Sequence, residues 1–389
     1  MGADTETRIL HLDDYRSRVA GSWIAKNVGV LLGQPFDGRP KPPKPVTGYV
    51  KWNDPGDPAA GVVPYKPAAA PCDDNTYCDV VALRAFERYG LWLTPQQLGK
   101  MWLAEGAGFQ GASLAARQAM LAGHWPPECG RPPHNPHYSD SDAQVSSTLY
   151  GLIAPGEINL AASTARTFNH INGFAEGSDG GVLFAAMISE AVFEPSLRSL
   201  VLRALNVLDS AAPTRVACEE IVAFRDSSVP WTEAAWRSQE RWRSRYPQAN
   251  NAVANAALVV LGLLYGEGDF METMNIILRA ADRTNTAGNA GIAASILGLM
   301  SGLRIVPAAL VQPLADTYPV APRANPGDAP LAPRQEKLSE LALRMAVLGS
   351  KFIIKRGRAR RDGHILTIPN PEPAAQPLET AAPWEGTAP

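Results

Sequence analysis

Residues 252–265 read AVANAALVVLGLLY, a nearly unbroken run of small and apolar side chains. A helix on a protein surface keeps one polar face, whereas this segment is apolar nearly all round, so it predicts a central buried helix. It is too short for a membrane span, which needs about 18 apolar residues or more. We therefore expect a soluble globular domain whose other elements pack around this segment.

Helical periodicity continues on both sides of the apolar segment. In residues 14–33, Val19, Trp23 and Val30 recur at spacings typical of a helix. Residues 94–104 begin with Thr94, Pro95 and Gln97, which form a capping box with proline at the first helical position. No segment shows a convincing alternation of apolar and polar side chains, the pattern of a strand. The sequence predicts an all-α fold.

The composition excludes several classes of protein. The 36 basic and 38 acidic residues leave a net charge of −2, so no chain-wide positive field favours nucleic acid or membrane as a partner. A hydrophobic content of 46% is too high for an intrinsically disordered chain. The four cysteines show no metal-type spacing and are too few for a disulfide framework. With no signal-peptide pattern at the N-terminus, we expect a cytoplasmic protein.

Proline and glycine mark the organisation of the chain. Residues 34–71 are rich in both and predict a long loop, which in a compact domain is usually functional or mobile. We therefore interpret this loop as part of the active site. We divide the chain into an N-terminal segment at 1–13, one helical domain at 14–361, and a proline- and alanine-rich tail at 362–389 that we expect to be disordered.

The segment DDNTYCD at 73–79 gathers oxygen-bearing side chains where the long loop meets a helix. Asp73, Asp74, Asn75 and Thr76 supply carboxylate, amide and hydroxyl groups within one turn, and Mg²⁺ prefers such oxygen ligands. Aspartate and asparagine are also good helix caps, so a cap explains the same residues without any metal. Both interpretations remain open at this point.

Two further polar segments favour the interpretation of a metal site. Residues 281–298, ADRTNTAGNAGIAASILG, place Asn285 and its polar neighbours at the start of a helix of small residues. Asp37 lies in the sequence QPFDG at the end of the first predicted helix, although a plain turn would account for it. Two oxygen-rich helix starts in one bundle can face each other across a single site.

These segments, taken in order, resemble the motifs of the ADP-ribosylglycohydrolase family over about residues 14–355. GQPFDG resembles the G-x-P-x-E/D-G turn that ends the first helix of the family, and DDNT resembles its D-D-D-T metal motif. Residues 281–298 resemble its last metal segment. The resemblance implies a single-domain orthogonal bundle of α-helices that cleaves N- or O-ribosyl bonds with two Mg²⁺ ions.

The family's acidic residues can be assigned to positions of this chain. Asp37 falls on a residue that acts near the scissile ribosyl carbon, and Asp73 and Asp74 fall on the metal motif. The resemblance therefore implies Asp37 and Asp74 as catalytic residues. It implies a metal-ligand set of Asp73, Asp74, Asn75 and Asn285.

Four positions depart from the family pattern. Asn75, Asn285 and Ala287 stand where the family has carboxylates, and Gly288 takes the position of its hydroxyl ligand. An asparagine supplies an oxygen without charge and an alanine supplies no ligand, so the charge of two Mg²⁺ ions is poorly balanced. We expect one Mg²⁺ ion or none.

Substrate contacts are expected from the segment that follows the central motif. His170 falls near a family histidine that helps line the ribose pocket. Glu176 and Asp179 lie in the glycine-rich loop GFAEGSDGG, where a flexible backbone beside carboxylates is typical of substrate-contacting loops. The expected substrate-binding residues are His170, Asn172, Glu176 and Asp179.

The function implied is hydrolysis of the N-ribosyl bond of a small ribosylated, nucleotide-derived or NAD-derived metabolite. One alternative is a lyase or cyclase that runs non-hydrolytic chemistry on the same scaffold, motivated by the missing ligands. Another is a non-catalytic protein that binds ADP-ribose or a nucleotide. Under each hypothesis the partner is a small molecule, with neither nucleic acid nor membrane, and the oligomeric state stays open.

Overall fold

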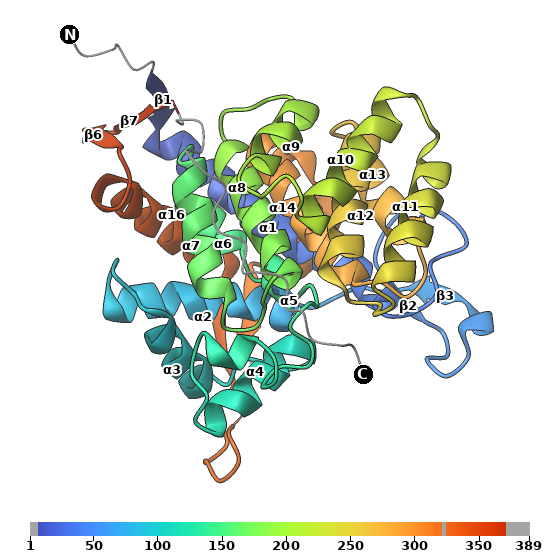
Figure 1. The fold of residues 1–389 in the computed structure, drawn as a ribbon, viewed down its shortest axis with the longest axis horizontal. Helices are drawn as coiled ribbons and strands as arrows, with labels where there is room; N and C mark the ends of the chain where they lie inside the picture. Colours follow the sequence, from blue (N-terminus) through green and yellow to red (C-terminus); the bar gives the residue numbers. More distant parts are fainter. Residues whose placement is uncertain (1–6, 321–323, 371–389) are drawn as a thin grey trace.

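The computed structural model describes residues 7–320 and 324–370, and its architecture is dominated by α-helices (Figure 1). This confirms the predicted all-α fold. The α-helices are α1 (Leu12–Gly33), α2 (Asp74–Tyr89), α3 (Pro95–Glu105), α4 (Gly111–Leu121), α5 (Asp142–Val145), α6 (Thr148–Leu152), α7 (Ile158–Asn169), α8 (Glu176–Glu190), α9 (Leu197–Leu205), α10 (Pro213–Asp226), α11 (Trp231–Arg245), α12 (Ala252–Gly266), α13 (Phe270–Ala280), α14 (Thr286–Ser301), α15 (Ala308–Val311) and α16 (Leu338–Lys355). No helix in the described ranges is long and apolar enough to cross a membrane.

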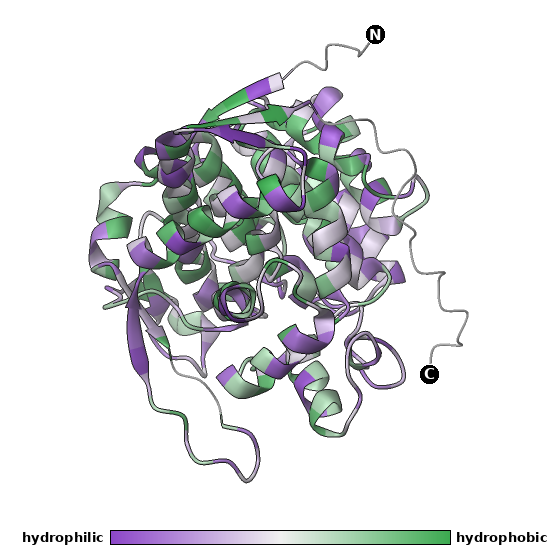
Figure 2. Ribbon diagram, turned by 90° about the vertical axis from the view of Figure 1, so that its left-hand side faces the viewer, coloured by the Kyte–Doolittle hydropathy of each residue, from purple (hydrophilic) through white to green (hydrophobic). Residues whose placement is uncertain are grey.

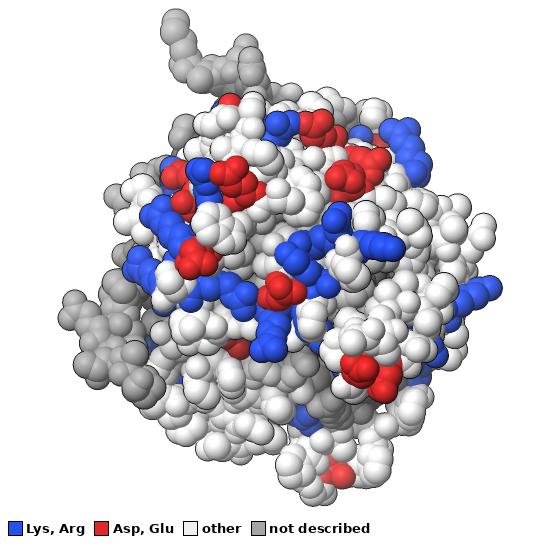
Figure 3. All heavy atoms as spheres, turned by 90° about the vertical axis from the view of Figure 1, so that its right-hand side faces the viewer, with Lys and Arg blue, Asp and Glu red and all other residues white. Residues whose placement is uncertain are grey.

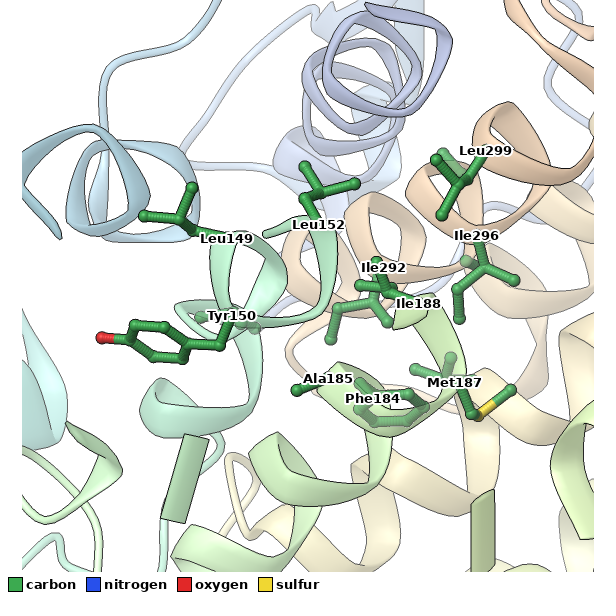
Figure 4. Close-up of a cluster of buried hydrophobic side chains, with 14 of the residues drawn as sticks. Leu149, Tyr150, Leu152, Phe184, Ala185, Met187, Ile188, Ile292, Ile296 and Leu299 are labelled. Carbon is green, nitrogen blue, oxygen red and sulfur yellow. The ribbon is translucent and has the colours of Figure 1, made fainter. Parts of the chain in front are cut away.

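The apolar segment at 252–265 forms the central helix α12, as its sequence predicts. Every residue of α12 except Tyr265 is buried, and α8, α10, α11, α13 and α14 pack around it. Across the molecule, hydrophobic and hydrophilic residues alternate along many of the helices, which is the pattern of helices with one face toward a core (Figure 2). A further part of the core lies where α6, α8 and α14 meet, through side chains such as Leu152, Ile188 and Ile292 (Figure 4).

Small residues bring α1 and α14 into direct backbone contact. A Cβ atom added to Gly29 would lie 2.4 Å from the carbonyl oxygen of Ala290, and one added to Gly33 would lie 2.5 Å from that of Thr286. Gly21 lies against Gly298 in the same way, so the two helices run antiparallel. This packing places the end of α1 beside the start of α14, the two points from which the site is built.

A buried ion pair ties α1 to α2. The Lys26 ammonium donates to Asp79 Oδ2 at 2.5 Å, to the Val145 carbonyl at 2.7 Å and to the Thr148 hydroxyl at 2.8 Å. Asp79 also accepts the backbone N–H of Leu149 at 2.9 Å. All three ammonium protons are therefore used, which is the condition under which a buried charge is tolerated.

Short strands lie at the periphery of the bundle. They are β1 (Thr7–His11), β2 (Val50–Trp52), β3 (Val62–Pro64), β4 (Thr317–Val320), β5 (Arg334–Lys337), β6 (Arg360–Asp362) and β7 (Ile365–Pro369). The sheet β1-β7-β6 is antiparallel, and Arg8 is paired with Ile368 in its register. Residues 7–11 pair with residues 365–369, and residues 360–362 pair with residues 365–367, so strand β7 lies within the segment assigned to the tail. The rest of that tail, from 371, lies outside the described residues.

The proline- and glycine-rich loop at 34–71 is held against the bundle. After the short 3-10 helix η1 (Gln34–Phe36), it forms the hairpin β2–β3 at the edge of the molecule (Figure 1). Val46 exchanges two hydrogen bonds with the Asn275 side chain, at 2.6 and 3.0 Å, and the Tyr49 hydroxyl donates to the Leu310 carbonyl at 2.7 Å. The Trp52 indole N–H donates to the Pro35 carbonyl. These contacts hold the hairpin over the end of α1.

Candidate active site

A cavity of about 670 Å³ opens between the end of α1, the hairpin, the start of α2 and the start of α14. A volume of this size suits a small-molecule ligand. Its polar wall comes from three of the segments that the sequence singles out. They contribute Asp37, Asp73, Asp74, Asn75 and Ala287 to the cavity surface.

Asp37 follows η1 and reaches across to the start of α14. Its Oδ1 atom accepts a hydrogen bond from the backbone N–H of Ala287 at 3.1 Å, and the next residue, Gly38, donates its N–H to the Thr284 carbonyl at 2.9 Å. Burial raises the pKa of Asp37 to about 6. The hydrogen bond from Ala287 opposes this rise, whereas the negative charges of Asp73 and Asp142 add to it. At neutral pH the side chain is mainly a carboxylate.

Asp74 is the first residue of α2 and is almost completely buried. Its carboxyl group accepts the backbone N–H groups of Phe109, at 2.8 Å to Oδ2, and of Gln110, at 3.0 Å to the same atom. Burial and then the charge of Asp142 raise the pKa of Asp74 to about 7, against the effect of the two amides. Near neutral pH this group therefore exists in both protonation states, unlike Asp37.

The DDNT segment also contains a helix cap and a hydroxyl group that faces the core. Asp73 is the N-cap of α2, and its Oδ1 atom accepts the Asn75 N–H at 3.0 Å. Burial raises the pKa of Asp73, while the bonds from Asn75 and the Lys26 charge lower it. The Thr76 hydroxyl donates to the Pro71 carbonyl and meets the Tyr318 hydroxyl, each at 3.0 Å, so it faces the core. The structure thus shows Asp73 as a helix cap, one of the two interpretations that the sequence left open.

Asn285, the expected ligand from the second motif, is also a helix cap. Its Oδ1 atom accepts the Gly288 N–H at 2.9 Å, and its Nδ2 atom donates to the Ser141 hydroxyl at 2.8 Å. Both ends of the amide are therefore used by the fold. Asn285 does not line the cavity, whereas Ala287 does. On the α14 side, the cavity wall consists of the methyl group and the backbone amide of Ala287.

Asp142 is the acidic residue that sequence reasoning missed. It is the first residue of α5, it is buried, and its Oδ1 atom accepts the Ser113 N–H at 2.9 Å. Its charge acts on both Asp37 and Asp74, which places it near the two cavity carboxylates. The only sequence signal is the repeated Ser-Asp at 139–142, at the end of a proline-rich stretch.

The four expected substrate-binding residues do not lie on this cavity. Asn172 is buried and donates to the Ser113 hydroxyl at 3.1 Å, and Asp179 pairs with Arg166 at 2.6 Å. The His170 ring lies 6.2 Å from the Phe174 ring, and Glu176 begins α8. Of these four residues, Asn172 and Asp179 thus have polar partners within the bundle.

Comparison with known proteins identifies the family of this chain. The family model described as ADP-ribosylglycohydrolase matches residues 11–349. The chain belongs to the ADP-ribosylglycohydrolase family. A solved structure titled "ADP-ribosylglycohydrolase-related protein complex" superposes with a TM-score of 0.55 at 16% identity, over 87% of this chain and 99% of that chain. At this identity the likeness shows the fold alone. No curated protein matches the chain.

ADP-ribosylglycohydrolases are hydrolases and typically depend on divalent metal ions, so we tested whether the residues present fit two ions. They do not. The Asn285 amide is used at both ends, Ala287 has no ligand atom, and Thr76 faces the core. Across residues 7–320 and 324–370, no group of three or more His, Cys, Asp or Glu side chains is arranged to hold a metal ion.

Proposed function

We propose that this family member hydrolyses the N-ribosyl bond of a small ribosylated or nucleotide-derived metabolite bound in the cavity. The observation that supports this most strongly is the pair of cavity carboxylates, Asp37 and Asp74, whose environments differ. Both come from motifs at which the chain resembles the family. The hydrolytic chemistry of the family supports the reaction class.

The two carboxylates suit different steps of the cleavage. Breaking a ribosyl bond builds positive charge at the anomeric carbon and negative charge on the leaving group. Asp37, mainly ionised at pH 7, would stabilise the first charge and take a proton from the attacking water. Asp74, with its pKa raised to about 7, would give a proton to the leaving group.

The metal requirement follows from the same residues. We propose that the site works with one Mg²⁺ ion or none, because the second family motif supplies a helix cap and a methyl group instead of carboxylates. Every step above is therefore assigned to side chains of this chain. A leaving group that departs as a neutral molecule, such as the pyridine base of a pyridinium riboside, takes no proton from Asp74 and needs the least electrophilic help.

Isotope labelling in H₂¹⁸O tests the proposal against its alternatives. Hydrolysis puts one ¹⁸O atom at the anomeric carbon of the released ribose, whereas elimination or cyclisation gives products without solvent oxygen. A binding protein gives no product at all. Turnover that is unchanged in both Asp37→Asn and Asp74→Asn would contradict the assignment of the site. Asp282→Asn is the matched control, since Asp282 is exposed and lies outside the cavity.

A further inference from the structure

The end of α16 and the strand β6 that follows it carry a local excess of positive charge. Residues 351–362 contain six basic residues and one acidic residue, Asp362. Arg358 is balanced by Glu157, whose Oε2 atom lies 3.6 Å from its Nε atom. The other five basic residues are exposed and form no ion pair within the described part of the chain. They are Lys351, Lys355, Arg356, Arg360 and Arg361, and we call them the basic surface.

Basic residues in other parts of the molecule have acidic neighbours. Arg344, earlier on α16, pairs with Glu87 at 2.6 Å and with Glu336 at 2.7 Å. On the side of the molecule that carries the hairpin β2–β3, acidic side chains lie among the basic ones (Figure 3). The net charge of −2, from which we expected no membrane partner, therefore hides the basic surface. Such a surface attracts anionic partners.

Trp92 lies exposed beside the basic surface. It is 71% exposed, and the Cζ atom of Arg356 lies 4.2 Å from the centre of its ring. The Arg356 guanidinium also donates to the Leu91 carbonyl at 2.9 Å, which holds it beside the ring. An indole combines an apolar ring with a polar N–H group, so it suits the boundary between water and an apolar phase.

The sheet β1-β7-β6 presents apolar side chains on its outer face. Its inner face packs on the core through residues such as Leu10 and Leu366, so the alternate residues face outward. Among these, Ile9 is 53% exposed and Ile365 is 37% exposed. In the register of the sheet, Ile9 and Arg360 lie opposite the same residue of β7. Aliphatic side chains thus border a cation of the basic surface.

This combination of cations and apolar side chains favours a lipid surface as the partner. Lysine and arginine meet anionic headgroups, while tryptophan and aliphatic side chains enter the boundary of the acyl chains. A nucleic acid would satisfy the cations and would stack on Trp92, but it offers no apolar phase for Ile9 and Ile365. We propose that the basic surface, together with these three apolar residues, binds the protein to an anionic lipid bilayer.

Attachment at this surface leaves the cavity accessible. Strands β6 and β7 lie at one end of the molecule, and the hairpin β2–β3, which borders the cavity, lies at the other (Figure 1). A small molecule in solution therefore reaches the cavity of the attached protein. The inference goes beyond the proposed function and does not depend on it.

Sedimentation of the full-length protein with lipid vesicles tests the inference. We expect the protein to sediment at low salt with vesicles of phosphatidylcholine and phosphatidylglycerol, and to be released as salt screens the charges. With vesicles of phosphatidylcholine alone it should stay in solution. Lys351→Gln/Lys355→Gln should bind the anionic vesicles at least about tenfold more weakly, because two contacts with headgroups are lost. Trp92→Ala, which keeps the charge, should bind them at least about threefold more weakly.

The matched control is Arg237→Gln/Arg241→Gln. It removes the same charge from two exposed residues of α11 that already pair with Glu233 and Glu220. We expect its affinity for the anionic vesicles to change less than about twofold, because paired surface charges contribute little.

The outcomes decide between a lipid surface and its alternatives. Weaker binding in the lysine and tryptophan variants, with binding kept in the control, supports the proposal. Absent sedimentation, or equal sedimentation of all variants, overturns it. Binding of a single-stranded oligonucleotide without binding of vesicles also overturns it and assigns the basic surface to nucleic acid. If the lysine variant unfolds, Arg360→Gln/Arg361→Gln provides the same test.

Discussion

Asp37 accepts a hydrogen bond at 3.1 Å from the backbone N–H of Ala287, a residue 250 positions further along the chain. The close packing of α1 against α14 makes this contact possible, because glycines let the two backbones touch. The resemblance puts Ala287 at the position of a family carboxylate, and in this structure its backbone N–H, at the N-terminus of α14, binds the carboxylate of Asp37. This hydrogen bond holds the Asp37 side chain in the cavity wall.

Replacing Asp37 by asparagine tests its chemical role. Asparagine can keep the hydrogen bond from Ala287 through its own oxygen, while the charge and the basic atom are lost. We expect kcat/KM for ribose release to fall at least about 100-fold, the scale of a lost general base. Steady-state kinetics measure this, with Asp282→Asn as the control. An effect of the same small size in both variants would remove Asp37 from the mechanism.

The same substitution should stabilise the fold at alkaline pH. The pKa of Asp37 is raised from 3.8 to about 6 in the folded protein, so its contribution to stability is present below pH 4 and is lost as the pH rises through 6. At pH 8 we expect Asp37→Asn to raise the free energy of unfolding by up to about 3 kcal/mol. Urea denaturation at pH 8 and pH 4 checks this. A gain of equal size at both values would argue against a buried, ionised Asp37.

The pH profile of the reaction should reflect two carboxyl groups with different pKa values. Activity needs Asp37 ionised, so kcat/KM should fall as the pH drops below about 6. It also needs Asp74 protonated, so kcat/KM should fall as the pH rises above about 7. We expect a maximum between these values. Asp37→Asn should lose the acidic limb, and an acidic limb that persists in this variant would assign that limb to another group.

The buried Lys26–Asp79 ion pair should contribute strongly to the free energy of unfolding of the protein. Removing one partner leaves an uncompensated buried charge, so we expect Lys26→Met to lower the free energy of unfolding by about 3–5 kcal/mol. Lys100→Met, at an exposed position of α3, should change it by less than about 0.5 kcal/mol. Chemical denaturation of both variants compares them. Similar stabilities would mean that the pair contributes nothing beyond packing.

Local sequence patterns predicted most of the fold. The capping box of Thr94 and Gln97 is present at the start of α3, and the central helix is buried on nearly all sides. The sheet β1-β7-β6 was missed because neither Thr7–His11 nor Ile365–Pro369 shows a long alternating pattern. Each strand is defined by a partner at the other end of the chain, and no local signal contains that information.

The candidate site was predictable only where a motif marks it. Asp37 and Asp74 were found through the resemblance, and the structure places both on one cavity. Asp142 was missed because its proximity depends on how α5 packs beside α2. Asp179 was expected at the substrate; it forms an ion pair with Arg166 and does not line the cavity. Loop composition predicts exposure and flexibility, whereas the partner of a charged side chain is decided by tertiary structure.

The central claim is that Asp37 and Asp74 support ribosyl hydrolysis without the two-metal site of the family. The most direct test measures divalent metal in the purified protein and ribose release with and without a chelator. We predict at most one bound ion per chain. We also predict that turnover persists in the chelator and is lost in Asp37→Asn and Asp74→Asn. Two tightly bound ions, with activity abolished by the chelator and restored by Mg²⁺, would contradict the account.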